Sequence, residues 1–91
     1  MKINNIKKKM DAGEMAYGCG IQHPSPTHVA WAGHTGFDFV EFSCCHVAVN
    51  PETLQDCIRA AEHYGVTPVA RTGSVDLYQI LNLLDIGIMG I

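Results

Sequence analysis

The order of apolar segments along this 91-residue chain constrains its fold more than any other feature. Short strand-like runs alternate with amphipathic, helix-like stretches, and Gly, Pro or Asn separates most of them. The expected strands are residues 15–21, 37–42, 66–70 and 87–91. A short first helix around residues 3–10 precedes them, and the expected helices between the strands are residues 24–33, 51–64 and 74–84. Such alternation with short connections predicts parallel strands joined by right-handed helical crossovers.

Capping residues and apolar spacing define the predicted helices. Asn50 and Pro51 are typical of an N-cap and a first turn, and Gly65 is typical of a helix end. Between them, an i, i+4, i+7 spacing predicts a buried face of Leu54, Ile58 and Ala61. In residues 74–84, a similar spacing predicts one apolar face of Leu77, Ile80, Leu81 and Leu84. Trp31 is expected to pack in the core or at an interface.

The length of the chain limits how much of an α/β fold it can form. A (β/α)8 barrel typically takes about 250 residues, and a doubly wound sheet is the other architecture with this alternation. The run at residues 87–91 is strand-like, with nothing after it. We therefore expect residues 1–91 to form one partial domain, the first half of a (β/α)8 TIM barrel, truncated at the fourth strand of a longer protein.

Composition excludes several classes of function. The formal net charge is −3, and the only basic cluster, residues 7–9, is expected to be a solvated helix face, so we expect no nucleic-acid partner. No stretch approaches the roughly 20 apolar residues of a membrane span, and the N-terminus lacks the apolar region of a signal peptide. A cytoplasmic location with reduced thiols is expected for the four cysteines, Cys19, Cys44, Cys45 and Cys57.

Two polar residues follow neighbouring predicted strands. His46 comes a few residues after the second strand, and Arg71 lies at the end of the third. Parallel α/β folds place chemistry at the carboxyl ends of their strands, so these side chains are expected on one rim. An imidazole can move a proton near neutral pH, and a guanidinium can hold a carboxylate with two hydrogen bonds. The pair predicts proton transfer on a small anionic substrate, although a surface histidine and a helix-pairing arginine would give the same pattern.

The triplet Cys44, Cys45 and His46 has other interpretations. A structural zinc site is not favoured, because partner spacings such as C-x2-C or H-x3-H are missing and the distant His63 is on the solvent side of a helix. A nucleophile–base pair of Cys44 and His46 would share a face of an extended segment, but no residue is evident to orient the imidazole. Small buried thiols are the ordinary alternative.

Three stretches of the chain, read together, carry more specific information. They are SPTHVAWAGHTGFDFVEFSCCH, RAAEHYGVTPVAR and SVDLYQILNLLDIGIMGI. In the same order, they resemble the patterns S-P-x-x-x-E-x-x-x-x-x-G-F-D-F-V-x-x-D-x-E-H, R-A-A-E-x-x-G-x-x-P-x-V-R and D-x-x-x-I-x-x-x-L-D-x-G-x-x-G-I of the HpcH/HpaI aldolases. The resemblance runs without a gap from about Gly18 to Ile91.

The resemblance implies a fold and an activity. The family consists of (β/α)8 barrels that use a divalent metal, Mg²⁺ or Mn²⁺, to stabilise the enolate of pyruvate or a related 2-oxo acid. The intact protein would cleave 2-oxo-hydroxy acids to pyruvate and an aldehyde, with metal ligands beyond this chain. By resemblance, His46 is the acid/base, and Arg71 is both a catalytic and a substrate-binding residue. A homo-oligomer is expected, since an exposed strand edge invites pairing.

Several positions depart from the family patterns. Ser43, Cys45 and Ala30 stand where the resemblance expects Asp, Glu and Glu, and Gly20 stands where an aromatic residue is often found. Loss of the Asp would leave the imidazole of His46 less well oriented and less basic. The alternative to a lyase is therefore a degenerate, non-catalytic relative that binds a small oxo acid or serves as an interaction module.

Overall fold

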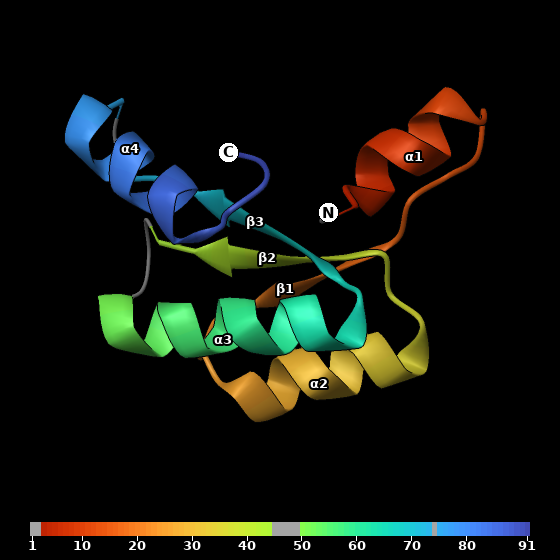
Figure 1. The fold of residues 1–91 in the computed structure, drawn as a ribbon, viewed down its shortest axis with the longest axis horizontal. Coiled ribbons are helices and arrows are strands. Elements are labelled where there is room, and N and C mark those ends of the chain that lie inside the picture. The colour runs from red at the N-terminus through yellow and green to blue at the C-terminus, as the bar shows by residue number, and fades with distance from the viewer. Residues whose placement is uncertain (1–2, 45–49, 74) are drawn as a thin grey trace.

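The computed structural model describes residues 3–44, 50–73 and 75–91, and Figure 1 shows a single sheet with helices on both sides. The sheet is three-stranded and entirely parallel, in the order β1–β2–β3. Its strands are β1 (Gly18–Ile21), β2 (Phe39–Ser43) and β3 (Thr67–Arg71). The helices are α1 (Asn5–Asp11), α2 (Pro26–Thr35), α3 (Pro51–Tyr64) and α4 (Leu77–Ile86). The predicted parallel α/β organisation is confirmed, with element boundaries shifted by one to three residues.

Helix α3 forms as its sequence predicts. The side chain of Asn50 accepts a hydrogen bond from the N–H of Glu52 at 2.8 Å, and Gly65 ends the helix with a φ of 71°. A left-handed φ of this kind suits glycine, which has no Cβ to clash. The predicted face of Leu54, Ile58 and Ala61 is buried, together with Cys57. Strong local signals at both ends and a regular apolar stripe account for this agreement.

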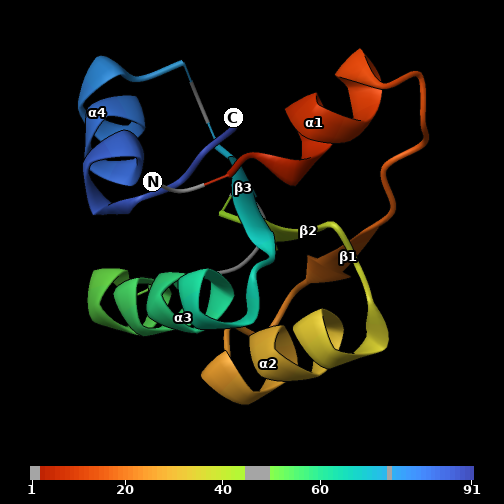
Figure 2. The same cartoon turned by 45° about the vertical axis from the view of Figure 1, so that its right-hand side comes forward.

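The core lies between the sheet and helices α2 and α3. Both helices lie on the same side of the sheet in Figures 1 and 2. On β2, Val40 and Phe42 are fully buried on that side, whereas Phe39, Glu41 and Ser43 alternate with them and are half-buried. Strand side chains alternate between the two faces of a sheet, so these three residues lie on the opposite face. We call this opposite side the open face; its residues are Gly18, Gly20, Phe39, Glu41, Ser43, Thr67, Val69 and Arg71, with Thr67 buried beneath the start of α1.

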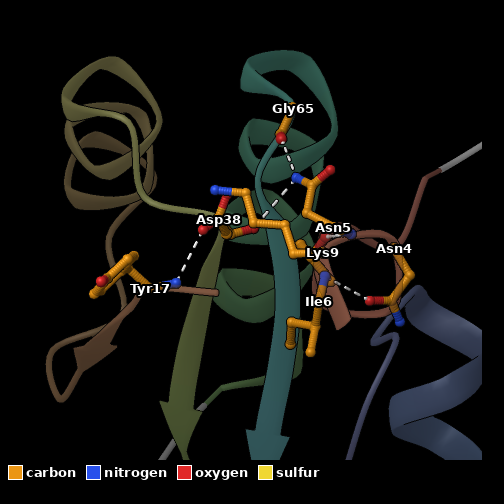
Figure 3. A network of polar contacts seen from close by, with 8 residues as sticks. Asn4, Asn5, Ile6, Lys9, Tyr17, Asp38 and Gly65 are labelled. Carbon is orange, nitrogen blue, oxygen red and sulfur yellow. Dashed lines mark hydrogen bonds and ion pairs between the residues drawn. The ribbon is translucent and has the colours of Figure 1, made fainter. Parts of the chain in front are cut away.

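Helix α1 is attached at the N-terminal end of the sheet. The backbone N–H of Asn5 donates to Oγ1 of the buried Thr67 at 2.8 Å, and its side-chain Nδ2 donates to the carbonyl of Gly65 at 2.7 Å (Figure 3). The side chain of Asn4 caps the helix by accepting from the N–H groups of Ile6 and Lys7. These polar contacts hold a short helix that has no buried residue of its own.

Asp38 joins the same end of the sheet to α1. Its carboxylate accepts the N–H of Tyr17 at 2.9 Å and forms an ion pair with Nζ of Lys9 at 3.1 Å (Figure 3). The N–H of Tyr17 holds the pKa of Asp38 below its usual value, and Lys9 acts in the same direction, while desolvation opposes both. The solvated helix face predicted for residues 7–9 is confirmed for Lys7 and Lys8, which are exposed, but not for the half-buried Lys9.

Large apolar side chains on α4 and α2 are exposed in the described structure, and an interface for Trp31 stays a prediction. On α4, Leu77, Leu81 and Leu84 are 69%, 47% and 48% exposed, and Leu83 is the buried residue. Trp31, expected in the core or at an interface, is 59% exposed, so it is not a core residue. On the predicted apolar face of α4, Ile80 is half-buried and the three leucines are exposed. Ser74, the predicted start of the last helix, lies outside the described residues.

The predicted fourth strand is also corrected. Residues 87–91 are not in a strand, although they run beside β3. The N–H of Met89 donates to the carbonyl of Pro68 at 2.9 Å, and the N–H of Ala70 donates to the carbonyl of Gly90 at 3.0 Å. In a regular parallel ladder, the N–H that donates to Pro68 and the carbonyl that accepts from Ala70 would belong to the same residue. Here they belong to Met89 and Gly90, so these two hydrogen bonds do not continue the sheet.

No helix in the described part of the chain is long and apolar enough to cross a bilayer.

Candidate functional site

The C-terminal ends of β2 and β3 meet at the edge where the sequence predicted a site. Ser43 is the register partner of Arg71, and the N–H of Cys44 donates to the carbonyl of Arg71 at 2.9 Å. The side chain of Arg71 is exposed at this edge. His46 lies outside the described residues, so its place on the rim and its role stay predictions.

The Phe39 ring covers the N-terminal part of the open face. Gly18 and Phe39 are register partners, and a Cβ on Gly18 would collide with the Phe39 ring. The ring therefore lies over β1 and closes the N-terminal part of the face. One pair further along, a Cβ on Gly20 would meet no atom within 4 Å. Space is thus available over β1 beside Glu41, the register partner of Gly20.

Glu41 is a charged residue in the middle of a strand, and the sequence analysis did not single it out. Its signal was available in the run FVEFS, where a carboxylate interrupts apolar and aromatic residues. Glu41 and Arg71 are the charged residues of the open face, one from the middle of β2 and one from the end of β3. The described structure therefore brings one carboxylate and one guanidinium to the same face.

The cysteines behave as packing residues. The Cys44 side chain lies on the helix side of β2 and packs against the core, away from the open face. Cys57 is fully buried, and this burial, with a contribution from the carboxylate of Asp56, raises the pKa of its thiol to about 11. Cys19, Cys44 and Cys57 form no disulfide bond in the described part of the chain. Cys45 lies outside the described residues.

Two further hollows lie near the C-terminal side of the sheet. A groove of about 550 Å³ runs between α3 and α4, with Cys44 and Leu83 among the residues that line it. A second hollow of about 380 Å³ at the end of β1 is lined by His23, His28 and Trp31, among others. Both histidines are exposed, His23 in the loop that follows β1 and His28 on α2.

Comparison with known proteins shows which proteins this chain resembles. No protein-family model matches the chain. A pyruvate aldolase of Rhizobium etli is 32% identical over 90 residues, which cover 97% of this chain and 35% of that protein. The solved structure of an HpcH/HpaI aldolase from Desulfitobacterium hafniense superposes with a TM-score of 0.85 at 28% identity, over 91% of this chain and 32% of the other. The chain is thus similar in sequence to a pyruvate aldolase and in fold to an HpcH/HpaI aldolase.

A third similar protein is a citrate synthase. The crystal structure of the citrate synthase SbnG superposes with a TM-score of 0.89 at 36% identity, over 94% of this chain and 35% of the other. The chain thus spans about one third of the length of each of these three proteins. Of the positions that depart from the HpcH/HpaI patterns, Ser43 lies opposite Arg71 and Gly20 opens the space beside Glu41.

Proposed function

We propose that the protein to which this chain belongs is a carbon–carbon lyase that cleaves 2-oxo-hydroxy acids to pyruvate and an aldehyde. The single observation that carries this proposal is the pairing of Ser43 with Arg71, which brings a guanidinium to the carboxyl edge of a parallel sheet. Relatedness to a pyruvate aldolase and to an HpcH/HpaI aldolase supports the choice of reaction. Because the chain spans about a third of these relatives, the activity is proposed for the whole protein.

Arg71 is proposed to hold the carboxylate of the 2-oxo acid. A guanidinium presents paired N–H donors that match a carboxylate, and its positive charge opposes the negative charge that develops on the neighbouring enolate oxygen. The other proposed participant, His46, would remove the proton from the substrate hydroxyl. The C–C bond then breaks, its electron pair forms the enolate of pyruvate, and the aldehyde leaves. Protonation of the enolate carbon completes pyruvate.

We also propose that β1, β2 and β3 are consecutive strands of a (β/α)8 barrel. Their parallel order follows the chain, and α2 and α3 cover one side of the sheet only. In a barrel, the open face would be the interior, and Arg71 would stand at the rim where such folds place their substrates. Closing a barrel would also cover the strand edges. Separately, we propose that the protein associates into a homo-oligomer.

A divalent cation is part of the proposal, but the described residues do not supply its site. Among residues 3–44, 50–73 and 75–91, no group of three or more His, Cys, Asp or Glu side chains is placed to bind a metal ion. We therefore propose that the ligands of Mg²⁺ or Mn²⁺ lie outside these 91 residues.

The full-length protein provides the test. Incubated with a 4-hydroxy-2-oxo acid and Mg²⁺ or Mn²⁺, it should release pyruvate, measured by reduction with lactate dehydrogenase. Chelation with EDTA should stop the release, and added metal should restore it. Release that continues unchanged in the chelator would contradict the metal-dependent mechanism, and no release with any hydroxy-oxo acid would contradict the lyase.

A non-catalytic oxo-acid binder is the second candidate. The observation that favours it is Ser43, which stands opposite Arg71 where the family resemblance expects an acid. Without a carboxylate there, the histidine has lost one partner that would orient it. This candidate predicts that pyruvate binds, measured by calorimetry, while no carbon–carbon cleavage occurs.

A further inference from the structure

Glu41 lies on the open face, two residues before Ser43, the last residue of β2. It is half-buried, with the fully buried Val40 and Phe42 on either side of it pointing toward the helices. Its register partners are Gly20 on β1 and Val69 on β3. Val69 presents a side chain on the β3 side, whereas Gly20 presents none, and a Cβ at Gly20 would meet no atom within 4 Å. The space beside Glu41 therefore opens toward β1.

The position of this space relative to Arg71 follows from strand geometry. Neighbouring strands lie about 4.8 Å apart and each residue advances about 3.3 Å, so the Cα atoms of Glu41 and Arg71 are separated by roughly 8 Å. An acid whose 2-oxo carboxylate is held by Arg71 can therefore extend its remaining carbons over Gly20, toward Glu41. The Phe39 ring closes the face beyond Glu41. The Glu41 carboxylate thus lies on this face between the level of Phe39 and the level of Arg71.

We infer that Glu41 determines specificity: it selects 2-oxo acids whose distal part is neutral or hydroxylated, and disfavours those with a second carboxylate. This inference rests on the proposed function, because it assumes that Arg71 anchors the 2-oxo carboxylate. A carboxylate accepts hydrogen bonds from hydroxyl groups, whereas a second anion within several ångströms is repelled. Rejection of a competitor by like charge is an established route to specificity. Gly20 contributes to this specificity because its lack of a side chain leaves space for the distal part of the 2-oxo acid.

Calorimetric binding to the full-length protein tests this without requiring turnover. The probes are 2-oxopentanoate, a monoanion, and 2-oxoglutarate, a dianion of the same carbon length. In Glu41→Gln, which preserves the shape of the side chain, the Kd of 2-oxoglutarate should fall about three- to tenfold. The Kd of 2-oxopentanoate should change less than twofold. Raising the salt concentration should reduce the difference between the two acids in the wild type, because charge repulsion is screened.

The control is Glu14→Gln, which removes one negative charge at an exposed position between α1 and β1. It should leave both Kd values unchanged. Equal changes for both acids in Glu41→Gln, or an unchanged Kd for 2-oxoglutarate, would overturn the inference and leave the proposed function intact. If Arg71→Gln leaves both Kd values unchanged, the anchoring assumed by the proposed function is wrong instead. Absence of binding by either acid to the wild type would overturn both.

Discussion

Ser43 and Arg71 are paired across the last positions of β2 and β3, and the N–H of Cys44 donates to the carbonyl of Arg71 at 2.9 Å. This hydrogen bond links the backbone of Arg71 to the first residue after β2. The Arg71 side chain therefore extends from a hydrogen-bonded backbone position at the edge where the two strands end.

Replacement of Arg71 by lysine should weaken oxo-acid binding. A lysine keeps the charge but loses the paired N–H donors that match a carboxylate. We expect the Kd of pyruvate for the full-length protein to rise about 10- to 100-fold, as measured by calorimetry. Arg59→Lys is the matched control, because Arg59 forms an exposed pair with Asp56 on α3. Equal effects of the two substitutions would show that Arg71 is no more than a surface cation.

Alanine substitutions at Gly18 and Gly20 should differ sharply. At Gly18 the new Cβ would collide with the Phe39 ring, so we expect a loss of about 1–3 kcal/mol in the free energy of unfolding. At Gly20 nothing lies within 4 Å of the new Cβ, and alanine restricts the unfolded chain. The second variant should be as stable as the wild type or up to about 1 kcal/mol more stable. Urea denaturation of both variants checks this, and equal losses would mean that Phe39 does not lie over β1.

Asp38 should contribute stability that depends on pH. Alanine removes the acceptor of the Tyr17 N–H and the partner of Lys9, which should cost about 1–2 kcal/mol near neutral pH. The pKa of Asp38 is lowered in the folded protein, so this contribution is present above the unfolded pKa of about 3.9. It is lost as the pH falls through the lower folded value. Denaturation curves of wild type and Asp38→Ala should therefore converge in acid.

Asp56→Ala is the control for that experiment. Its partner Arg59 lies three residues away on the same helix, and both side chains are largely exposed, at 58% and 71%. An exposed pair of this kind is worth about 0–1 kcal/mol. A loss at Asp56 as large as that at Asp38 would contradict the assigned role of Asp38 in joining α1 to the sheet.

The thiol of Cys57 should be unreactive in the folded protein. Its pKa is raised to about 11 by burial, with Asp56 contributing, so little thiolate is present at pH 8. We expect iodoacetamide to modify Cys57 only after unfolding, as seen by peptide mass spectrometry. The free energy of unfolding should also decrease as the pH rises from about 9 toward 11, because the unfolded thiol ionises first. Rapid labelling of Cys57 under native conditions would show that the α3 face is not closed.

Sequence-based prediction worked where short-range signals decide the structure. The Asn50 cap, the Gly65 end and the apolar stripe between them define α3 without reference to the rest of the chain. The strands around Phe42 and Val66 were found within one to three residues for the same reason. The parallel arrangement also followed from the element order alone, since short helical crossovers leave few alternatives.

Prediction was wrong where burial depends on a partner surface. The apolar stripe of α4 indicated a helix correctly, but it could not show that Leu83 would be the buried residue while Leu77 and Leu81 stayed exposed. Glu41 was overlooked because its importance comes from its neighbours across two strands, which are distant in sequence. The proposed roles of His46 and Arg71 stay predictions that the experiments above test.

By itself, the sequence determined the alternating elements, their caps and the resemblance to the HpcH/HpaI aldolases, because periodicity, capping and motifs are properties of neighbouring residues. Only the tertiary structure decided that Ser43 meets Arg71, that Gly18 lies beneath Phe39 and that Glu41 faces the space at Gly20. Strand register produces these contacts, and a shift of one residue would turn each side chain to the opposite face of the sheet.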